Sequence, residues 1–594
     1  MVMQILLLVL ASFLGSGVLF AHRRILTYLA AAGILFEVQW LALTLLDRTL
    51  FQNIEMELVF WVGSILALIL WAVHYKKFSF PALDGGEMVA VVVTLAALTA
   101  AFIVFEFNTL SLFDWKTHGF FNGDTSTLIA ITQKSFLTNG LVQENPFAGN
   151  GVLEYPSLLH GGLATFFSGV SGGTPLDWYR FLPLLTYLQI VLTVPMFFLL
   201  WDAVYPEPAE GWKMWFGVPS RWAILILQGV LVLYVMALSW ESFVYPQGHF
   251  FLAGVFLLMA ALLATSWGGK MREMLPQLGL AVVVGLVLLF SNAVTGTAAV
   301  LLKVVFDGLH VIKRGQPVIT RLGWGVGVLF WVVMFFLFTP GNGSLGAVPW
   351  FSYTAAVEMG RLAPMLILVA IGIFLVYERK LFVSAAAVGM MVLALITFVF
   401  SAREIVVENA SRFFYHAVLL AFPLALSPLI QSFYWFRREF VLSSRLTVEK
   451  IVGWGTAFVL LAIFLLPAGT SVGSAHDNLM FKDEQVISAA MQEAMDWVAH
   501  NTDSTAIFLT SPDAPFLVPM LTGRAQLRSG FWLSPDDRAL ADVQAAFAGS
   551  QSAQEMVASQ ADYLLLQGEE RTQWGSLGRE PIFRSPNLLI YTLR

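Results

Sequence analysis

Long apolar runs, separated by short polar stretches, make up most of the first 470 residues of this chain. A run of about 20 apolar residues is long enough to cross a bilayer as a helix. The runs predict about fourteen membrane-spanning helices, near residues 3–21, 25–46, 57–75, 87–106, 180–201, 221–239, 246–267, 277–290, 294–309, 322–339, 363–377, 381–401, 413–432 and 451–468. The pattern therefore predicts an α-helical polytopic membrane protein, and its first run lacks the basic stretch of a cleaved signal peptide.

The apolar pattern ends near residue 470 and a mixed pattern follows. Residues 484–501 carry apolar positions at helical spacing. Four short runs have the composition of strands, at 506–510, 563–566, 581–584 and 588–592. We therefore predict a small C-terminal α/β domain and divide the chain into three N-terminal helices (1–80), a membrane core (81–469) and this domain (470–594).

Composition supports a membrane protein and excludes several kinds of site. The chain is 58% hydrophobic and only 12% charged, about half the charged fraction of a soluble domain. It has no cysteine, which excludes disulfides, thiolate metal sites and cysteine nucleophiles. The net charge of −6 arises mainly from the acidic C-terminal domain, and no basic surface that would bind nucleic acid is apparent.

The basic residues orient the membrane part. Seventeen Lys and Arg residues fall in alternate loops, and seven fall in the loops on the opposite side. Because loops rich in Lys and Arg stay in the cytoplasm, we expect both termini, the long loop 107–179 and the C-terminal domain outside the cytoplasm. The expected location is an inner or plasma membrane.

Loop 107–179 contains two short amphipathic segments, near residues 125–139 and 156–170. Treating 156–170 as a span would break the alternation of basic loops, so we predict two helices at the membrane surface. Asp124 has the position and chemistry to cap the first helix, and Gly140 to end it.

Asp124 and Glu241 are the acids that stand out as candidates for chemistry. Glu241 lies in a short turn between two apolar helices, so it is held near the membrane surface. Two carboxylates there could act as a general base and as a ligand for metal or substrate. On the residues alone, a helix cap explains Asp124 equally well, and a solvated turn residue explains Glu241 equally well.

Residues 401–415 supply the candidate cations. Arg412 and Arg403 lie close to the start of an apolar run, where a guanidinium can bind phosphate oxygens in pairs. Snorkelling to the interface, or an ion pair of Arg412 with Glu408, explains them at least as well. His160 and His249 fit aromatic packing better than ligation.

In this order, the features resemble the GT-C superfamily of integral membrane glycosyltransferases, which includes protein mannosyltransferases, aminoarabinose transferases and the catalytic subunit of oligosaccharyltransferase. The resemblance rests on Gly123-Asp124-Thr125, Tyr155-Pro156, Arg180-Phe181-Leu182-Pro183, the acid Glu241 and Arg412-Phe413-Phe414-Tyr415. It covers roughly residues 87–594. A single acid stands where oligosaccharyltransferases have a pair, which leaves metal dependence open, and the tail lacks their Trp-Trp-Asp motif, which argues against N-glycosylation.

The resemblance implies an inverting transferase that moves a sugar from a polyprenyl-phosphate or pyrophosphate donor to the hydroxyl of a glycan, lipid or protein acceptor in cell-envelope synthesis. Asp124 would be the general base, and Glu241 would orient a sugar or, with Asp124, a divalent cation (Mg²⁺ or Mn²⁺). Arg412, Arg403 and Arg361 would hold the donor phosphate. The expected substrate-binding residues are Tyr155, His160, Tyr245, His249 and Glu408.

The alternative function is a non-catalytic membrane scaffold, or a transporter of lipid or polysaccharide in the cell envelope. A transporter would favour charges deep in its spans and internally repeated broken helices. The charges here cluster at one face and no repeat is apparent, which favours the enzyme. The sequence leaves the donor sugar, the acceptor and the oligomeric state open.

Overall fold

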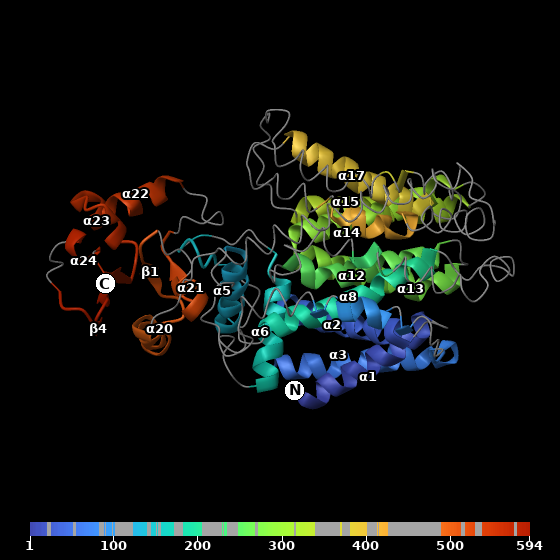
Figure 1. Ribbon diagram of the computed structural model, residues 1–594, viewed down its shortest axis with the longest axis horizontal. Helices are drawn as coiled ribbons and strands as arrows, with labels where there is room; N and C mark the ends of the chain where they lie inside the picture. The colour runs from blue at the N-terminus through green and yellow to red at the C-terminus, as the bar shows by residue number, and fades with distance from the viewer. Residues whose placement is uncertain are drawn as a thin grey trace, which may run out of the picture.

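The computed structural model places a bundle of long helices beside a smaller C-terminal domain (Figure 1). The residues that it describes are 1–20, 25–51, 55–81, 88–89, 91–97, 99–100, 123–138, 144–149, 151, 156–171, 182–204, 229, 231–233, 248–267, 271–313, 317–338, 367, 369–370, 381–400, 413, 415–425, 489–512, 517–528, 537–568, 570–574 and 579–594.

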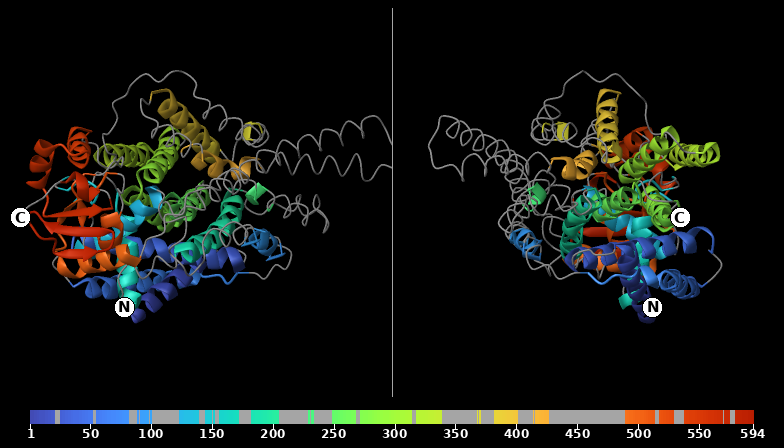
Figure 2. Two further views of the ribbon diagram at one scale, coloured as in Figure 1. Left: turned by 60° about the vertical axis from the view of Figure 1, so that its left-hand side comes forward. Right: turned by 90° about the vertical axis from the view of Figure 1, so that its right-hand side faces the viewer.

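The bundle is built from long apolar helices that run back and forth along one direction (Figures 1 and 2). They are α1 (Val2–Leu19), α2 (Ile25–Thr49), α3 (Met56–Val73), α8 (Leu182–Val204), α12 (Gly248–Ser266), α13 (Met271–Ser291), α14 (Ala293–Ile312), α15 (Val318–Phe338) and α17 (Leu381–Phe400), with a 3-10 turn η1 (Tyr75–Lys77) after α3. In the part of the chain that the structure describes, six helices are long and apolar enough to cross a membrane. The predicted helical membrane fold is thereby confirmed.

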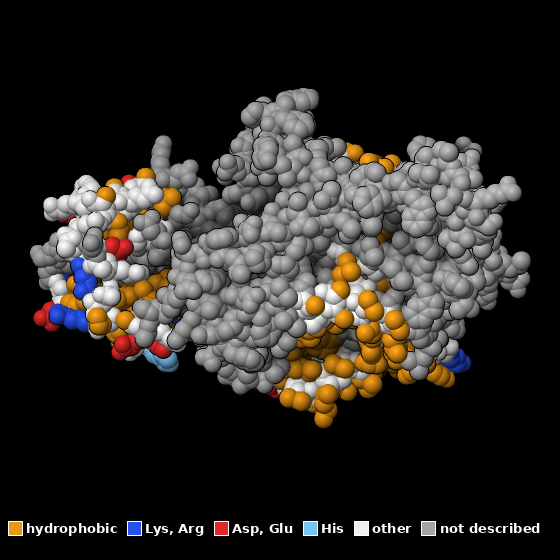
Figure 3. Space-filling view, in the orientation of Figure 1, with side chains coloured by type: hydrophobic (Ala, Val, Ile, Leu, Met, Phe, Trp, Pro, Cys, Tyr) orange, Lys and Arg blue, Asp and Glu red, His pale blue; other side chains and the backbone are white. Residues whose placement is uncertain are grey.

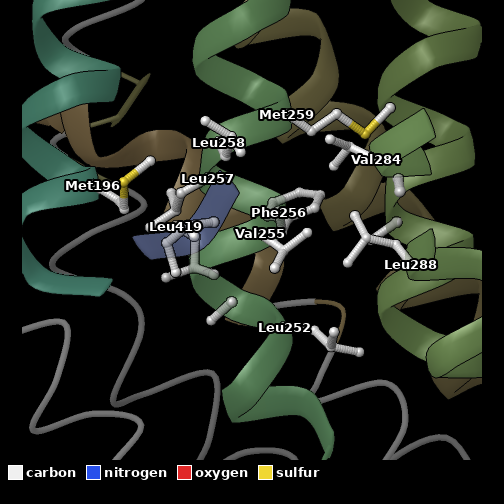
Figure 4. Close-up of a cluster of buried hydrophobic side chains, with 14 of the residues drawn as sticks. Met196, Leu252, Val255, Phe256, Leu257, Leu258, Met259, Val284, Leu288 and Leu419 are labelled. Carbon is white, nitrogen blue, oxygen red and sulfur yellow. The ribbon is translucent and has the colours of Figure 1, made fainter. Parts of the chain in front are cut away.

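α12 is the centre of the bundle. Every residue from Leu252 to Leu263 whose side chain is hydrophobic is fully buried, as expected for a helix that is apolar on all sides. Figure 4 shows Met196 of α8 on one side of α12 and Val284 and Leu288 of α13 on the other.

The outer surface of α3 shows the opposite distribution. Its apolar side chains point away from the bundle, and Figure 3 shows hydrophobic side chains covering this face. Leu58, Leu66, Leu70 and Val73 are each more than half exposed. Because a soluble monomer does not leave so large an apolar patch exposed, this face fits contact with lipid.

The segments at 277–290 and 294–309 form two separate helices, α13 and α14, as predicted. The chain reverses at Asn292, whose side-chain oxygen accepts hydrogen bonds from the amides of Val294 and Thr295, each at 3.0 Å. The cap satisfies two amides that have no partner within α14, so a single residue suffices to join the two helices.

The C-terminal domain contains a five-stranded sheet in the order β2-β1-β3-β5-β4. Its elements are α20 (Ala489–Asn501), β1 (Ile507–Leu509), α21 (Leu517–Thr522), β2 (Ala525–Gln526), α22 (Asp537–Phe547), α23 (Gln551–Ala558), β3 (Tyr563–Gln567), α24 (Glu570–Gln573), β4 (Phe583–Ser585) and β5 (Leu588–Thr592). β1 pairs in parallel with β2 and β3, whereas β5 pairs antiparallel with β3 and β4.

Successive residues of β3 point to opposite faces of this sheet. Leu565 joins the buried cluster that contains Val498 of α20, whereas Leu564 and Leu566 join the cluster that contains Val543 and Val557 of α22 and α23. The domain is therefore three-layered. The predicted α/β tail is confirmed; the strand β2, only two residues long, was not predicted.

Candidate functional site

Two short helices lie at the end of the bundle that faces the C-terminal domain: α5 (Gly123–Thr138) and α6 (Leu158–Ser171) (Figure 1). Together with the turn at residues 144–151 they form the part of loop 107–179 that the structure describes, and we call this unit the hood. Both helices were predicted, within two residues at each described end. α6 has 14 residues and lies at the bundle end, in agreement with a surface helix instead of a span.

Asp124 is the second residue of α5. It therefore lies in the first turn of the helix, two positions further in than the predicted cap. A carboxylate in a first turn is still stabilised by the positive end of the helix dipole. The backbone thus places the predicted general base at the very start of the hood, as the sequence suggests.

Residues 129–135 of α5 are buried because the helix is covered on several sides, by α6 and by α21 of the C-terminal domain. Lys134 is the unexpected residue in this stretch, since its side chain is 1% exposed. Its Nζ lies 2.8 Å from Glu144 Oε2 and donates to the carbonyl of Ser504, 3.4 Å away. Two ionisable residues of loop 107–179 thus bind each other, and Lys134 also bonds to the C-terminal domain.

The turn at 144–151 extends the sheet of the C-terminal domain. The amide of Gly149 donates to the carbonyl of Gln526 at 2.7 Å, and the amide of Gln526 donates to the carbonyl of Pro146 at 2.9 Å. Arg528 Nη1 donates to the carbonyl of Gly149 at 3.0 Å. The turn therefore pairs with β2, which is the strand at that edge of the sheet.

Arg524 supports the domain side of this contact. Its guanidinium donates to the carbonyls of Thr522, Ala499 and Thr502, at 2.7, 2.8 and 2.9 Å. Burial lowers the pKa of Arg524, and the neighbouring charge of Asp503 raises it in part. The amide of Thr505 and the hydroxyl of Thr505 both donate to Asp503, and these two bonds lower the pKa of that carboxyl, the amide bond most strongly. These bonds join the end of α20 to the α21–β2 turn, against which α5 packs.

α6 lies against the end of α2 and also contacts α13. His160, on α6, is 3% exposed, so it is buried within the hood instead of facing open solvent. Its role in binding a substrate stays a prediction.

The helices that follow Glu241 and Arg412 in sequence are neighbours in the bundle. α12 begins at Gly248, and an apolar helix runs over Tyr415–Ala425. They meet where the ring of His416 packs edge-on against Phe256, with centroids 5.0 Å apart. His249 is the second residue of α12. The backbone therefore brings the chain segments after both predicted functional residues to adjacent helices.

Several predicted site residues lie outside the described residues: Tyr155, Glu241, Tyr245, Arg361, Arg403, Glu408 and Arg412. The same holds for the predicted spans at 221–239, 363–377 and 451–468 for most or all of their length. Among the residues that the structure does describe, no group of three His, Asp or Glu side chains is placed to hold a metal ion. The divalent cation stays a prediction.

Two buried charge pairs escaped the sequence analysis. Arg48 Nε lies 3.4 Å from Asp47 Oδ2 at the hood end of α2. Lys303 binds Asp307 within α14, with Nζ to oxygen distances of 2.5 and 2.6 Å. The sequence contained a signal for the pair of Lys303 and Asp307, because oppositely charged residues at (i, i+4) inside an apolar run form a pair when they are buried.

We compared the sequence and the structure of this chain with those of known proteins. The sequence matches no protein-family profile and no curated protein. Its structure is similar to the crystal structure of the oligosaccharyltransferase of Archaeoglobus fulgidus in its apo form, with a TM-score of 0.50 and 12% identity over 81% of this chain and 69% of that one. The chain has the GT-C fold.

Two structures of ArnT from Cupriavidus metallidurans are also similar to this chain. The apo structure gives a TM-score of 0.47 and the complex with undecaprenyl phosphate 0.48, each at 11% identity over 85% of this chain and 98% of ArnT. At 12% identity, the comparison with the oligosaccharyltransferase establishes a shared fold and no more. The fold predicted from the order of the motifs between Gly123 and Tyr415 is thereby confirmed.

Proposed function

We propose that this protein is an inverting glycosyltransferase that transfers a sugar from a polyprenyl-phosphate or polyprenyl-pyrophosphate donor to an extracytoplasmic acceptor hydroxyl. The observation that carries the proposal is the hood: in a chain with the GT-C fold, the first turn of α5 contains Asp124 at the end of the helix bundle. A membrane-surface position suits a donor whose sugar and phosphate lie at headgroup level while its polyprenyl chain stays in lipid.

In this proposal Asp124 takes the proton from the acceptor hydroxyl. The oxygen attacks the anomeric carbon as the bond from that carbon to the phosphate oxygen breaks, and polyprenyl phosphate leaves from the opposite face. Configuration is therefore inverted. Because phosphate is a good leaving group, the protein contributes mainly by positioning the reactants and stabilising charge.

Arg412, with Arg403 or Arg361, would hold the departing phosphate through paired hydrogen bonds. Glu241 would orient the sugar. If a divalent cation binds, Asp124 and Glu241 are the residues that would hold it, and it would stabilise negative charge on the phosphate. The acceptor would enter beneath the hood, in a cell-envelope pathway of glycan, glycolipid or glycoprotein synthesis.

The test is transfer by the purified full-length protein, reconstituted in phospholipid vesicles, with radiolabelled polyprenyl-phosphate sugars. We expect sugar transfer or release by the wild type. Asp124→Asn keeps the shape of the side chain but not its basicity, so transfer should fall by at least 100-fold while the protein stays folded and in the membrane. Transfer at the wild-type rate by Asp124→Asn would refute the assignment of the base.

Arg412→Ala examines donor binding separately. Loss of a phosphate ligand should raise the apparent KM for the donor, whereas a residue that only anchors the chain at the interface should leave it unchanged. Donor binding without turnover in the wild type would favour the non-catalytic scaffold, and movement of intact lipid between leaflets would favour the transporter.

A further inference from the structure

α6 of the hood is bonded to α2, one of the three N-terminal helices. Trp40 Nε1 donates to the carbonyl of Gly162 at 3.0 Å, and Arg48 Nη2 donates to Thr165 Oγ1 at 3.0 Å. All four residues are buried or nearly so. The two bonds are about two helical turns apart on α2 and one turn apart on α6, so they fix both the position and the direction of α6.

The surfaces between these bonds fit closely. A Cβ atom at Gly162 would lie 2.4 Å from Leu41 Cδ2, so only glycine permits this approach without displacement of Leu41. The ring of Phe166 packs edge-on against Trp40, with centroids 5.4 Å apart. Further along α6, a Cβ at Gly169 would lie 2.4 Å from Met1 Cγ, so the residue that precedes α1 also lies close to α6.

The charged group at this contact is costly to bury. Arg48 is 5% exposed and Asp47 is 6% exposed, at the end of a mostly apolar helix. A charge buried in such surroundings is retained where it is paired or has a role. Asp47 supplies the counter-charge, and the guanidinium also donates to Thr165 of α6.

α2 is in turn held by the centre of the bundle. It packs against α8, α12 and α13. Gly33 allows Leu192 of α8 to approach, and Gly254 of α12 allows Ile34 to approach, so that a Cβ at either glycine would lie within 2.8 Å of its neighbour. Because α2 is packed against α8 and α12, its bonds to α6 also hold α6 in place relative to α12.

We infer that the N-terminal helices are a positioning unit for the hood, and that Arg48 and Trp40 of α2 are positioning residues that set α6 relative to the bundle. The inference on catalysis rests on the proposed function. α6 packs against α5, so a displaced α6 shifts the helix whose first turn contains Asp124. Loss of the Arg48–Thr165 bond therefore lowers turnover and leaves donor affinity unchanged.

The first experiment measures kcat and the donor KM in the vesicle assay. Thr165→Val removes the acceptor with almost no change in shape, and its matched control Thr165→Ser keeps it. We expect kcat to fall roughly 10- to 100-fold in Thr165→Val and Arg48→Met, with KM unchanged, near wild-type values in Thr165→Ser and partial recovery in Arg48→Lys. Equal rates in Thr165→Val and Thr165→Ser, or a change in KM alone, would overturn the catalytic inference.

The second experiment needs no activity, and it uses the absence of cysteine from the chain. Ala164 of α6 is 1% exposed, so Ala164→Cys introduces a single protected thiol. We expect a membrane-impermeant maleimide to label this thiol about tenfold faster when Thr165→Val or Arg48→Met is added, because loss of one charged hydrogen bond raises the open population by about that factor. Thr165→Ser should leave the rate unchanged.

The two experiments separate the two proposals. If the wild type transfers no sugar, the proposed function fails, and labelling alone decides whether α2 positions α6. If labelling is equally slow in Ala164→Cys alone and in its combinations with Thr165→Val, Arg48→Met and Thr165→Ser, the positioning role is refuted. This holds whether or not the protein is an enzyme.

Discussion

The ion pair between Lys134 and Glu144 gives an asymmetric prediction. The Lys134 side chain is 1% exposed, whereas the Glu144 side chain is 61% exposed. Removing the exposed acid should therefore weaken the contact between hood and C-terminal domain more than removing the buried base. The change to make is Glu144→Ala in one variant and Lys134→Met in the other.

The magnitudes follow from what each substitution leaves behind. In Lys134→Met the stem still packs and Glu144 becomes hydrated, so the cost is that of a partly exposed ion pair, about 1 kcal/mol. In Glu144→Ala the ammonium stays buried and, among the residues that the structure describes, keeps only the long bond to the carbonyl of Ser504, 3.4 Å. Breaking a buried pair in this way costs about 3 kcal/mol or more.

Hydrogen exchange measured by mass spectrometry reports the opening of this contact locally. The amides to follow are those of Gly149 and Gln526, which bond the turn to β2. Their protection should fall about fivefold in Lys134→Met and about 100-fold in Glu144→Ala, since 1.4 kcal/mol corresponds to a factor of ten.

Glu555→Ala is the matched control, because Glu555 lies exposed on α23 of the same domain and accepts a long hydrogen bond, 3.4 Å, from the exposed Gln551. It should change protection by less than about 0.5 kcal/mol. The double variant Lys134→Met/Glu144→Ala should resemble Lys134→Met. An equal or smaller effect of Glu144→Ala than of Lys134→Met would show that this reasoning about the buried ammonium is wrong.

Two further predictions concern single backbone positions. Asn292→Ala removes the cap that accepts from the amides of Val294 and Thr295; exchange of these two amides should speed up by about fivefold, for a cost of about 1 kcal/mol, and Asn292→Ser should restore most of the protection. Gly523 has φ of +70°, and a Cβ there would lie 2.7 Å from Leu137 Cδ1 and 3.2 Å from the carbonyl of Gln133. Gly523→Ala should therefore reduce the exchange protection of the Gly149 and Gln526 amides by tenfold or more. Unchanged protection would show that α5 can move away without cost.

The sequence predicts those elements whose signal is local. α5 and α6 follow from helical spacing and turn residues, and α13 and α14 follow from two apolar runs with Asn292 between them. In the C-terminal domain, β1, β3, β4 and β5 coincide with four short apolar runs. The fold class follows from the lengths of the apolar runs, because a bilayer admits few ways to satisfy the backbone of an apolar chain.

The contacts between these elements could not be predicted in the same way. Pro146 and Gln526 are 380 positions apart, and nothing in either segment specifies the other. Lys134 and Glu144 bind each other, although no local pattern in loop 107–179 indicates the pair. Arg48 is buried and bonded to Thr165, which lies 117 positions away in the sequence. Each of these depends on how the hood packs, which is a property of the whole fold.

The hood is consequently held from two sides, by α2 at α6 and by the C-terminal domain at α5. The distance along α5 from Lys134 to Asp124 is ten residues, or about 15 Å. A rotation of about 5° about the Lys134 contact would therefore move the start of the helix by about 1.3 Å, and in an enzyme a misplacement of about 1 Å can cost 100-fold in rate. If Asp124 is the base, both contacts are needed for turnover even though neither touches the reacting atoms. Substitutions at Lys134 or Glu144 should then lower kcat in proportion to the loss of protection at Gly149, and a rate that stays constant while protection falls would place the catalytic group outside α5.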